Sequence, residues 1–170
     1  NREVRTVFTD TFLGWLEDAT PGTTSAGLTA LSDAMLRGDT ADFAEQLEAI
    51  MVAMLSHHDL AGERVEAVYQ AFLVGLLVHL QDTHRVASNR EAGFGRADVL
   101  VVPRTPGPGA VLELKRITRR ETPEHALERA VTQLRERDYA AEVRAAGATD
   151  VYQYAVVFDG KRCWMERVEG

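Results

Sequence analysis

The stretch Val111-Leu112-Glu113-Leu114-Lys115 has the alternating pattern of a strand with two different faces. Successive side chains on a strand point to opposite faces, so Glu113 and Lys115 share one face while the leucines occupy the other. The strand therefore holds a carboxylate and an ammonium group one pleat apart on a stiff element. The alternative is a solvated face on which the two residues form a weak ion pair.

The residues upstream predict a second strand and a hairpin. Segment 95–102 reads as a strand with Asp98 near its start, and the connection 103–109 is rich in Pro and Gly, which favour turns. A hairpin between the two strands can bring Asp98 beside Glu113. Two carboxylates next to Lys115 form a plausible magnesium site, because Mg²⁺ prefers oxygen ligands.

The composition is that of an ordinary domain with a sizeable core. Of the 170 residues, 45% are hydrophobic and 26% are charged. The single cysteine, Cys163, excludes an internal disulfide framework, and no zinc-ligand spacing occurs. The sequence shows no signal peptide, and its longest apolar run, 71–80, is too short to span a bilayer. We therefore expect a cytoplasmic protein without a membrane partner.

The charge is distributed unevenly along the chain. Residues 1–83 contain four Lys/Arg and thirteen Asp/Glu, whereas residues 84–170 contain fifteen and thirteen. The acidic first half argues against a protein that coats nucleic acid indiscriminately. The second half can still carry a local basic face.

Hydrophobic periodicity and turn residues predict the order of the elements. Helices are expected over 1–17, 28–36 (ending at Gly38), 40–55, 61–82 and 123–146, and further strands over 84–92, 151–158 and 162–168. The chain thus reads as helices followed by β-β-β-α-β-β. We expect an α/β fold with a mixed sheet of about five strands, the first three antiparallel, flanked by helices 61–82 and 123–146.

Glu66 heads a partly apolar face of the 61–82 helix. A carboxylate in such a place usually has a partner or a metal. An exposed Glu in the first turn, where it suits the helix dipole, is the alternative.

Arg129, Gln133 and Arg137 recur every four residues in the last predicted helix and would form one continuous ridge. Small residues beside the ridge, Ala126 and Ala130, would permit close approach of a phosphate backbone. A solvated basic face is the alternative.

The ordered set of these residues resembles the PD-(D/E)XK nuclease superfamily. More narrowly, it is similar to the nuclease domain that follows an AAA-ATPase-like domain in a widespread group of bacterial proteins. The motifs that carry the resemblance span essentially the whole chain: Asn1-x-Glu3-Val4-Arg5 with Phe8, Glu66-x-x-Tyr69, Gly93-x-Gly95-Arg96-x-Asp98, Leu112-Glu113-Leu114-Lys115, and Gln133-Leu134 with Tyr139. Gln70 stands where this family usually has a histidine.

The resemblance implies a restriction-endonuclease-like fold, with a helical part over 1–60 and a nuclease core over 61–170. It implies a metal-dependent nuclease that hydrolyses phosphodiester bonds of nucleic acid, DNA being favoured over RNA, with Mg²⁺ or Mn²⁺ as cofactor. A start at Asn1 rather than Met agrees with a domain cut from a longer protein that carries the AAA-ATPase-like domain upstream.

Each site residue has an expected role. Asp98 and Glu113 would hold the metal, Lys115 would orient or deprotonate the attacking water, and Glu66 would add a carboxylate. Gln133 would position the nucleophile or the phosphate, and the main-chain carbonyl of Leu114 is a possible further ligand. The residues expected to contact nucleic acid are Tyr69, Arg96, Arg116, Arg119, Arg129 and Arg137. The alternative function is a catalytically silent module of the same fold that binds nucleic acid or regulates; oligomeric state, sequence specificity, the number of metals, and endo- or exonucleolytic cutting stay open.

Overall fold

The computed structural model describes residues 25–55, 65–88 and 97–169. The helices are α2 (Ser25–Arg37), α3 (Thr40–Met54), α4 (Val65–Leu76), α5 (Pro123–Glu136) and α6 (Tyr139–Ala145), with a 3₁₀ turn, η1, at Val78–Asp82. The strands are β1 (His84–Ser88), β2 (Val99–Pro103), β3 (Gly107–Arg116), β4 (Ala148–Asp159) and β5 (Arg162–Val168). The helix predicted over 1–17 lies outside the described residues.

The five strands form one sheet in the order β1-β2-β3-β4-β5. β1, β2 and β3 are antiparallel neighbours, β3 and β4 are parallel, and β5 returns antiparallel to β4. The parallel pair requires a crossover connection, which α5 and α6 provide. The prediction of a mixed α/β sheet whose first three strands are antiparallel is confirmed.

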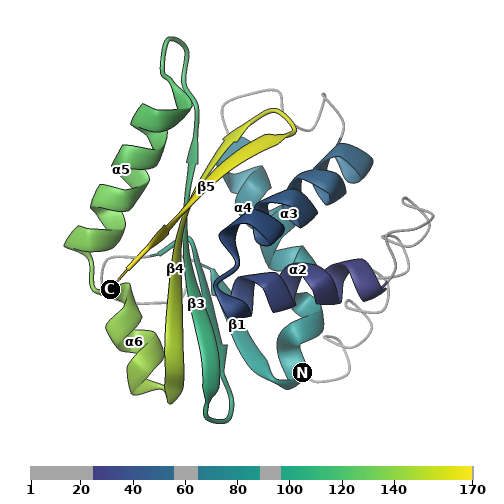
Figure 1. Ribbon diagram of the computed structural model, residues 1–170, viewed down its shortest axis with the longest axis vertical. Coiled ribbons are helices and arrows are strands. Elements are labelled where there is room, and N and C mark those ends of the chain that lie inside the picture. The colour runs from purple at the N-terminus through teal and green to yellow at the C-terminus, as the bar shows by residue number, and fades with distance from the viewer. Residues whose placement is uncertain (1–24, 56–64, 89–96, 170) are drawn as a thin grey trace.

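Helices cover both faces of the sheet, with α2, α3 and α4 on one side and α5 and α6 on the other (Figure 1). The side chains of β3 divide between these layers. Leu112 and Leu114 belong to the core formed with α2–α4, whereas Val111 packs with residues of α5 and α6. Glu113 and Lys115 have the same parity as Val111, so β3 presents them to the α5 side.

The helices before the sheet share its core. The Tyr154 hydroxyl of β4 donates to the Met35 carbonyl of α2 at 2.6 Å, and Phe43 of α3 meets the Tyr154 ring edge-on. Gly38 ends α2 with a φ of +76°, as predicted, because glycine adopts this left-handed conformation readily. Asp39 then caps α3 by accepting a main-chain N–H of its first turn. These helices are therefore part of the packed structure.

Two predicted helices are shorter than expected. Of the 61–82 helix, the described part runs as α4 to Leu76 and then tightens into η1. The 123–146 helix is in fact two helices, because Arg137 has an extended backbone (φ −119°, ψ 110°) and ends α5. The Asp138 carboxylate then caps α6 by accepting the Ala141 N–H at 3.1 Å. Such a cap competes with continuation of the helix, which periodicity alone does not reveal.

β3 begins at Gly107, inside the segment that we predicted as a loop. The close approach of α6 requires glycine at position 109 of this strand. A Cβ on Gly109 would lie 2.6 Å from Val143 Cγ1 and 2.9 Å from the Val101 carbonyl oxygen. β1 is described from His84 to Ser88, and the rest of its predicted range lies outside the described residues. None of the described helices is long and apolar enough to cross a membrane.

Candidate active site

Asp98 and Glu113 meet where β2 begins. Val99 pairs with Leu112 in the β2–β3 ladder, so Asp98, one residue earlier, comes beside Glu113. The Leu114 N–H donates to Asp98 Oδ2 at 2.8 Å, which ties the Asp98 carboxylate to the strand that carries Glu113. The charge of Asp98 is close enough to raise the pKa of Glu113. The hairpin thus brings the two predicted carboxylates together.

Glu113 is almost completely buried and only partly paired. Its side chain is 1% exposed, and Lys115 Nζ lies 2.5 Å from Oε1. Its second oxygen, Oε2, is the one buried side-chain polar atom among the described residues that has no hydrogen-bond partner. Burial and then the charge of Asp98 raise the pKa of Glu113 to about 7, while Lys115 acts in the opposite direction. The alternative of a solvated strand face is therefore wrong.

Tyr69 anchors α4 to the sheet. Its side chain is 2% exposed, its ring stacks on Phe158 with centroids 4.2 Å apart, and its hydroxyl donates to the Gly160 carbonyl at 2.7 Å. Burial raises the pKa of Tyr69 to about 12, so the hydroxyl remains protonated. The structure therefore places Tyr69 inside the fold, away from the surface that a ligand would touch.

Glu66 and Gln70 approach the carboxylate pair from α4. Gln70 Nε2 donates to the main-chain carbonyl of Asp98 at 2.7 Å. Glu66 lies one turn earlier, in the first turn of the helix, and is exposed. Its charge is near enough to contribute to the raised pKa of Glu113. The structure thus brings Glu66 into the neighbourhood of the pair while leaving it in contact with solvent.

A cavity of about 430 Å³ lies beside Lys115 on the α5 side of the sheet. Four predicted site residues line it: Lys115, Gln133, Arg129 and Arg137. Arg137 is the residue at which α5 ends, and its backbone is extended. Arg129, Gln133 and Arg137 therefore line one cavity, but the prediction that they form a continuous helical ridge is wrong.

Ala126 and Ala130 are fully buried in the packed face of α5. The prediction that they flank a phosphate path is wrong. Small side chains let the helix approach the sheet closely, so these positions serve packing.

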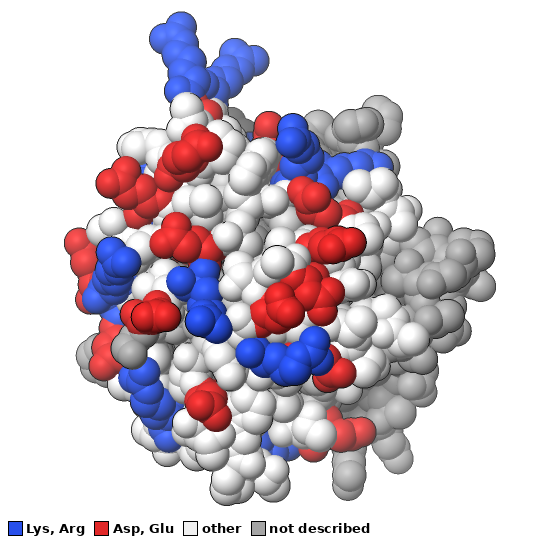
Figure 2. All heavy atoms as spheres, viewed as in Figure 1, with Lys and Arg blue, Asp and Glu red and all other residues white. Residues whose placement is uncertain are grey.

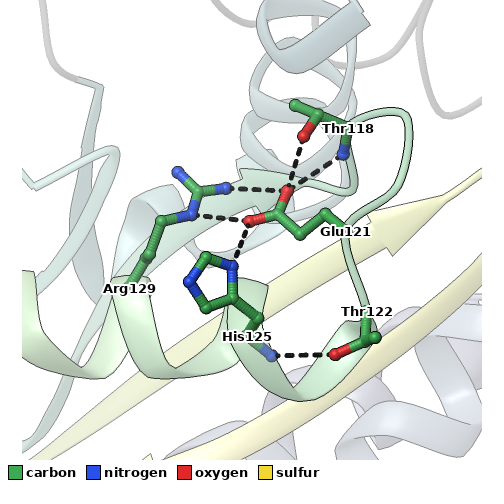
Figure 3. A network of polar contacts seen from close by, with 5 residues as sticks. All are labelled: Thr118, Glu121, Thr122, His125 and Arg129. Atoms are coloured by element: carbon green, nitrogen blue, oxygen red, sulfur yellow. Dashed lines mark hydrogen bonds and ion pairs between the residues drawn. The ribbon is translucent and has the colours of Figure 1, made fainter.

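Glu121 organises the connection 117–122 between β3 and α5 (Figure 3). Its side chain is 7% exposed and accepts from the Thr118 N–H and hydroxyl at 3.0 and 2.9 Å. Arg129 donates to both carboxylate oxygens, from Nε at 2.8 Å and from Nη2 at 3.2 Å, and His125 Nδ1 lies 3.2 Å away. The Thr118 N–H, with Arg129 also contributing, holds the pKa of Glu121 near 2. Arg129 therefore lines the cavity as an ion-paired group.

Arg116 and Arg119, two described residues that we predicted to contact nucleic acid, are not among the residues that line the cavity. In Figure 2 acidic and basic side chains are interspersed over the visible face, and basic side chains project at the top, over the loop that joins β3 to α5. Arg119 and Arg120 of this loop are exposed. Arg116 is half-buried, with its charge near Tyr69. Arg96 lies outside the described residues.

The donor set at Asp98 and Glu113 suits a hard divalent cation, which prefers carboxylate and carbonyl oxygens. Glu113 Oε2 has no hydrogen-bond partner, and burial together with the charge of Asp98 outweighs Lys115 in raising the pKa of Glu113. Across residues 25–55, 65–88 and 97–169, no group of three or more His, Cys, Asp or Glu side chains is placed to hold a metal. A cation at the pair would therefore need main-chain or water oxygens as well.

The sheet order and its two helical layers define a restriction-endonuclease-like α/β fold, in which Glu113 is buried on the central strand, β3, beside half-buried Asp98 at the start of β2. A family model described as the PD-(D/E)XK nuclease superfamily matches residues 64–168, and the chain belongs to this superfamily. Its members are usually hydrolytic nucleases that act on nucleic acid and use divalent metals. No curated protein and no solved structure matched the chain.

Sequence reasoning missed two residues of this region. Gln70 stands four residues after Glu66, and that spacing is the signal for its place at the site. Glu121, His125 and Arg129 are also spaced by four, which indicates a shared stripe. The spacing of Gln70 does not reveal its partner, the Asp98 carbonyl, because that contact depends on how α4 packs against the sheet. The partners of Glu121 are local, and two of them lie on the stripe itself.

Proposed function

We propose that this protein is a magnesium-dependent nuclease that hydrolyses phosphodiester bonds of nucleic acid, with DNA favoured over RNA. The observation that carries the proposal is buried Glu113 beside half-buried Asp98 and Lys115, in a chain of the PD-(D/E)XK nuclease superfamily. We further propose that the nuclease core spans 61–170, that 1–60 is its helical N-terminal part, and that an AAA-ATPase-like domain precedes it in a longer, cytoplasmic protein.

In this proposal Asp98 and Glu113 hold Mg²⁺, or Mn²⁺, with the Leu114 carbonyl as a further ligand and Glu66 as an outer carboxylate. The bound cation would supply charge stabilisation at the phosphate and a more acidic water. The support lies in the charge of the site: two carboxylates converge, and one of them has an unpartnered buried oxygen.

Lys115 links the carboxylate pair to the cavity. Its Nζ contacts Glu113 Oε1, and the same side chain lines the cavity that Gln133 also lines. We propose that Lys115 orients the attacking water and neutralises developing negative charge, because an ammonium placed beforehand needs no reorganisation during the reaction. Gln133 would hold the phosphate or the nucleophile through its amide.

The backbone of the nucleic acid would run along the cavity and along the connection 117–122 between β3 and α5. Arg129 and Arg137 line the cavity, and Arg119 lies on the exposed connection after β3. Contacts to phosphate oxygens fix the position of a nucleic acid without reading its sequence. Arg116 and Arg96 are proposed as further phosphate contacts, and Tyr69 as a residue that anchors its own helix, α4, to the sheet.

The test is a cleavage assay on plasmid DNA, linear DNA and RNA with Mg²⁺ or Mn²⁺, with and without chelator. We expect metal-dependent cleavage that Asp98→Asn and Glu113→Gln each abolish. Glu128→Gln, which changes an exposed carboxylate on α5, is the matched control and should cut like the wild type. A protein that binds DNA without cutting it under any of these conditions would favour the catalytically silent module.

A further inference from the structure

Asp98 is held from two sides of the fold. The Gln70 amide on α4 donates to the Asp98 carbonyl oxygen at 2.7 Å. The Leu114 N–H on β3 donates to Asp98 Oδ2 at 2.8 Å. One contact therefore fixes the main chain of Asp98 and the other fixes its carboxylate.

The main-chain contact matters because Asp98 precedes the regular strand. β2 begins at Val99, so Asp98 lies just before the paired β2–β3 ladder. A hydrogen bond to the Asp98 carbonyl fixes the plane of the peptide that follows it, and with it the direction in which the side chain leaves the backbone. This control is needed where the side chain has to meet Glu113.

The donor itself is rigidly placed. Tyr69, the neighbour of Gln70, is 2% exposed, stacks on Phe158 and donates to the Gly160 carbonyl. α4 is thereby fixed to β4 and to the turn after it, so the Gln70 amide has a defined position relative to the sheet. A flexible surface glutamine would not hold a peptide group in this way.

We infer that Gln70 is a positioning residue that holds Asp98 in the orientation needed to bind a divalent cation together with Glu113. The inference rests on the proposed function, because it takes the Asp98–Glu113 pair as the cation site. Without the Gln70 N–H donor, the Asp98 peptide can turn and the two carboxylates converge less well. Partners that orient metal ligands typically change affinity by about tenfold or more.

The experiment measures Mn²⁺ binding by calorimetry on the metal-free full chain, together with thermal melting in chelator. Gln70→Met keeps the length of the side chain but removes the donor, and Gln70→Ala is a second variant without the donor. Gln70→His keeps a donor, since the imidazole Nε2 lies as many bonds from Cα as the glutamine Nε2. Gln46→Met is the matched control: Gln46 is also half-buried on a helix and donates to Asp42 Oδ1 at 3.2 Å, on a different element.

We expect Gln70→Met and Gln70→Ala to weaken Mn²⁺ binding about tenfold. Gln70→His should stay within about threefold of the wild type, and Gln46→Met should bind like it. Methionine and alanine variants that bind Mn²⁺ as the wild type does would overturn the inference, even if their metal-free melting temperatures fall, because that is a structural role only. A histidine variant as weak as the methionine variant would also overturn it, since the N–H donor would then not matter.

Asp98→Asn separates this inference from the proposed function. If the wild type binds no Mn²⁺, or if Asp98→Asn binds it equally well, the proposed cation site is wrong and the role of Gln70 falls with it. If Asp98→Asn loses binding while both donor-less Gln70 variants retain it, only the role of Gln70 is overturned.

Discussion

Replacing Glu113 by glutamine is expected to stabilise the metal-free protein at alkaline pH. In the folded protein, burial and the charge of Asp98 raise the pKa of Glu113 from 4.5 to about 7. Between these two values the folded state binds a proton that the unfolded chain has released. The contribution of Glu113 to the free energy of unfolding must therefore fall as the pH rises from about 4.5 to about 7, and stay low above that range.

The size of the effect follows from the same two pKa values. One pKa unit corresponds to about 1.4 kcal/mol, so the difference between 4.5 and about 7 amounts to roughly 3 kcal/mol at pH 8. This is a large share of the roughly 5–15 kcal/mol that stabilises a typical domain. Glutamine has the same shape, does not ionise, and its carbonyl can still accept from Lys115. Glu113→Gln should therefore be more stable than the wild type by about 3 kcal/mol at pH 8, and close to it at pH 4.5.

The assay is urea unfolding at four pH values between 4.5 and 8, in chelator, for the wild type and Glu113→Gln. The difference between the two proteins isolates Glu113, because the other titrating groups, including half-buried His79, are common to both. Glu121→Gln is the control, and it should lower stability because the Glu121 carboxylate is favourably paired. Equal pH dependence of the wild type and Glu113→Gln, or a less stable Glu113→Gln at pH 8, would refute the reasoning.

Three further predictions concern the elements around the pair. Glu121→Ala should lower the free energy of unfolding in urea by roughly 2 kcal/mol at pH 7, because Thr118 and Arg129 lose a charged acceptor. Since the pKa of Glu121 is lowered to about 2, this difference from the wild type should vanish as the pH falls from 4.5 toward 2. A difference that is independent of pH would contradict the prediction. Arg137→Ala should weaken DNA binding equally for all sequences and reduce the salt dependence of binding. Arg129→Ala should do the same and should also lower the melting temperature, because the ion pair with Glu121 is lost. Tight binding that survives both changes would disprove this substrate path. Gly109→Ala should lower stability by about 2 kcal/mol or more in the same unfolding assay, because its Cβ would lie 2.6 Å from a Val143 methyl group, and an unchanged midpoint would show that α6 yields easily.

The central hairpin could be predicted because its information is local. Alternation along β3 places Glu113 on the face of the strand that Leu112 and Leu114 do not occupy. The connection rich in Pro and Gly requires β3 to fold back along β2. The burial of Glu113 was less predictable, because a Glu/Lys pair on a strand face is usually solvated. It follows from α5 covering that face, which is a property of the packed sheet.

Other features depend on competition between local and distant contacts. Arg137 lies within a helical pattern, yet the Asp138 cap ends α5 there. In the sequence, Ala126 and Ala130 are as compatible with a solvent-facing side of the helix as with a buried one. They are core residues because α5 packs closely against the sheet. Gln70 shares a helical stripe with Glu66, but its partner, the Asp98 carbonyl, is apparent only in the packed fold.

The electrostatics of the pair connect stability to cation binding. At neutral pH, with Glu113 ionised, Asp98 and Glu113 carry two negative charges against the single positive charge of Lys115, and Glu66 adds a third negative charge at the exposed side. The roughly 3 kcal/mol that ionised Glu113 costs comes first from burial of its carboxylate and then from the charge of Asp98. Any divalent cation that binds the folded state alone recovers stability by mass action, by about 2.7 kcal/mol at a hundred times its dissociation constant. Metal should therefore raise the melting temperature of the wild type most at alkaline pH, and the rise should shrink in Glu113→Gln, which has lost both a ligand and the repulsion that the cation relieves.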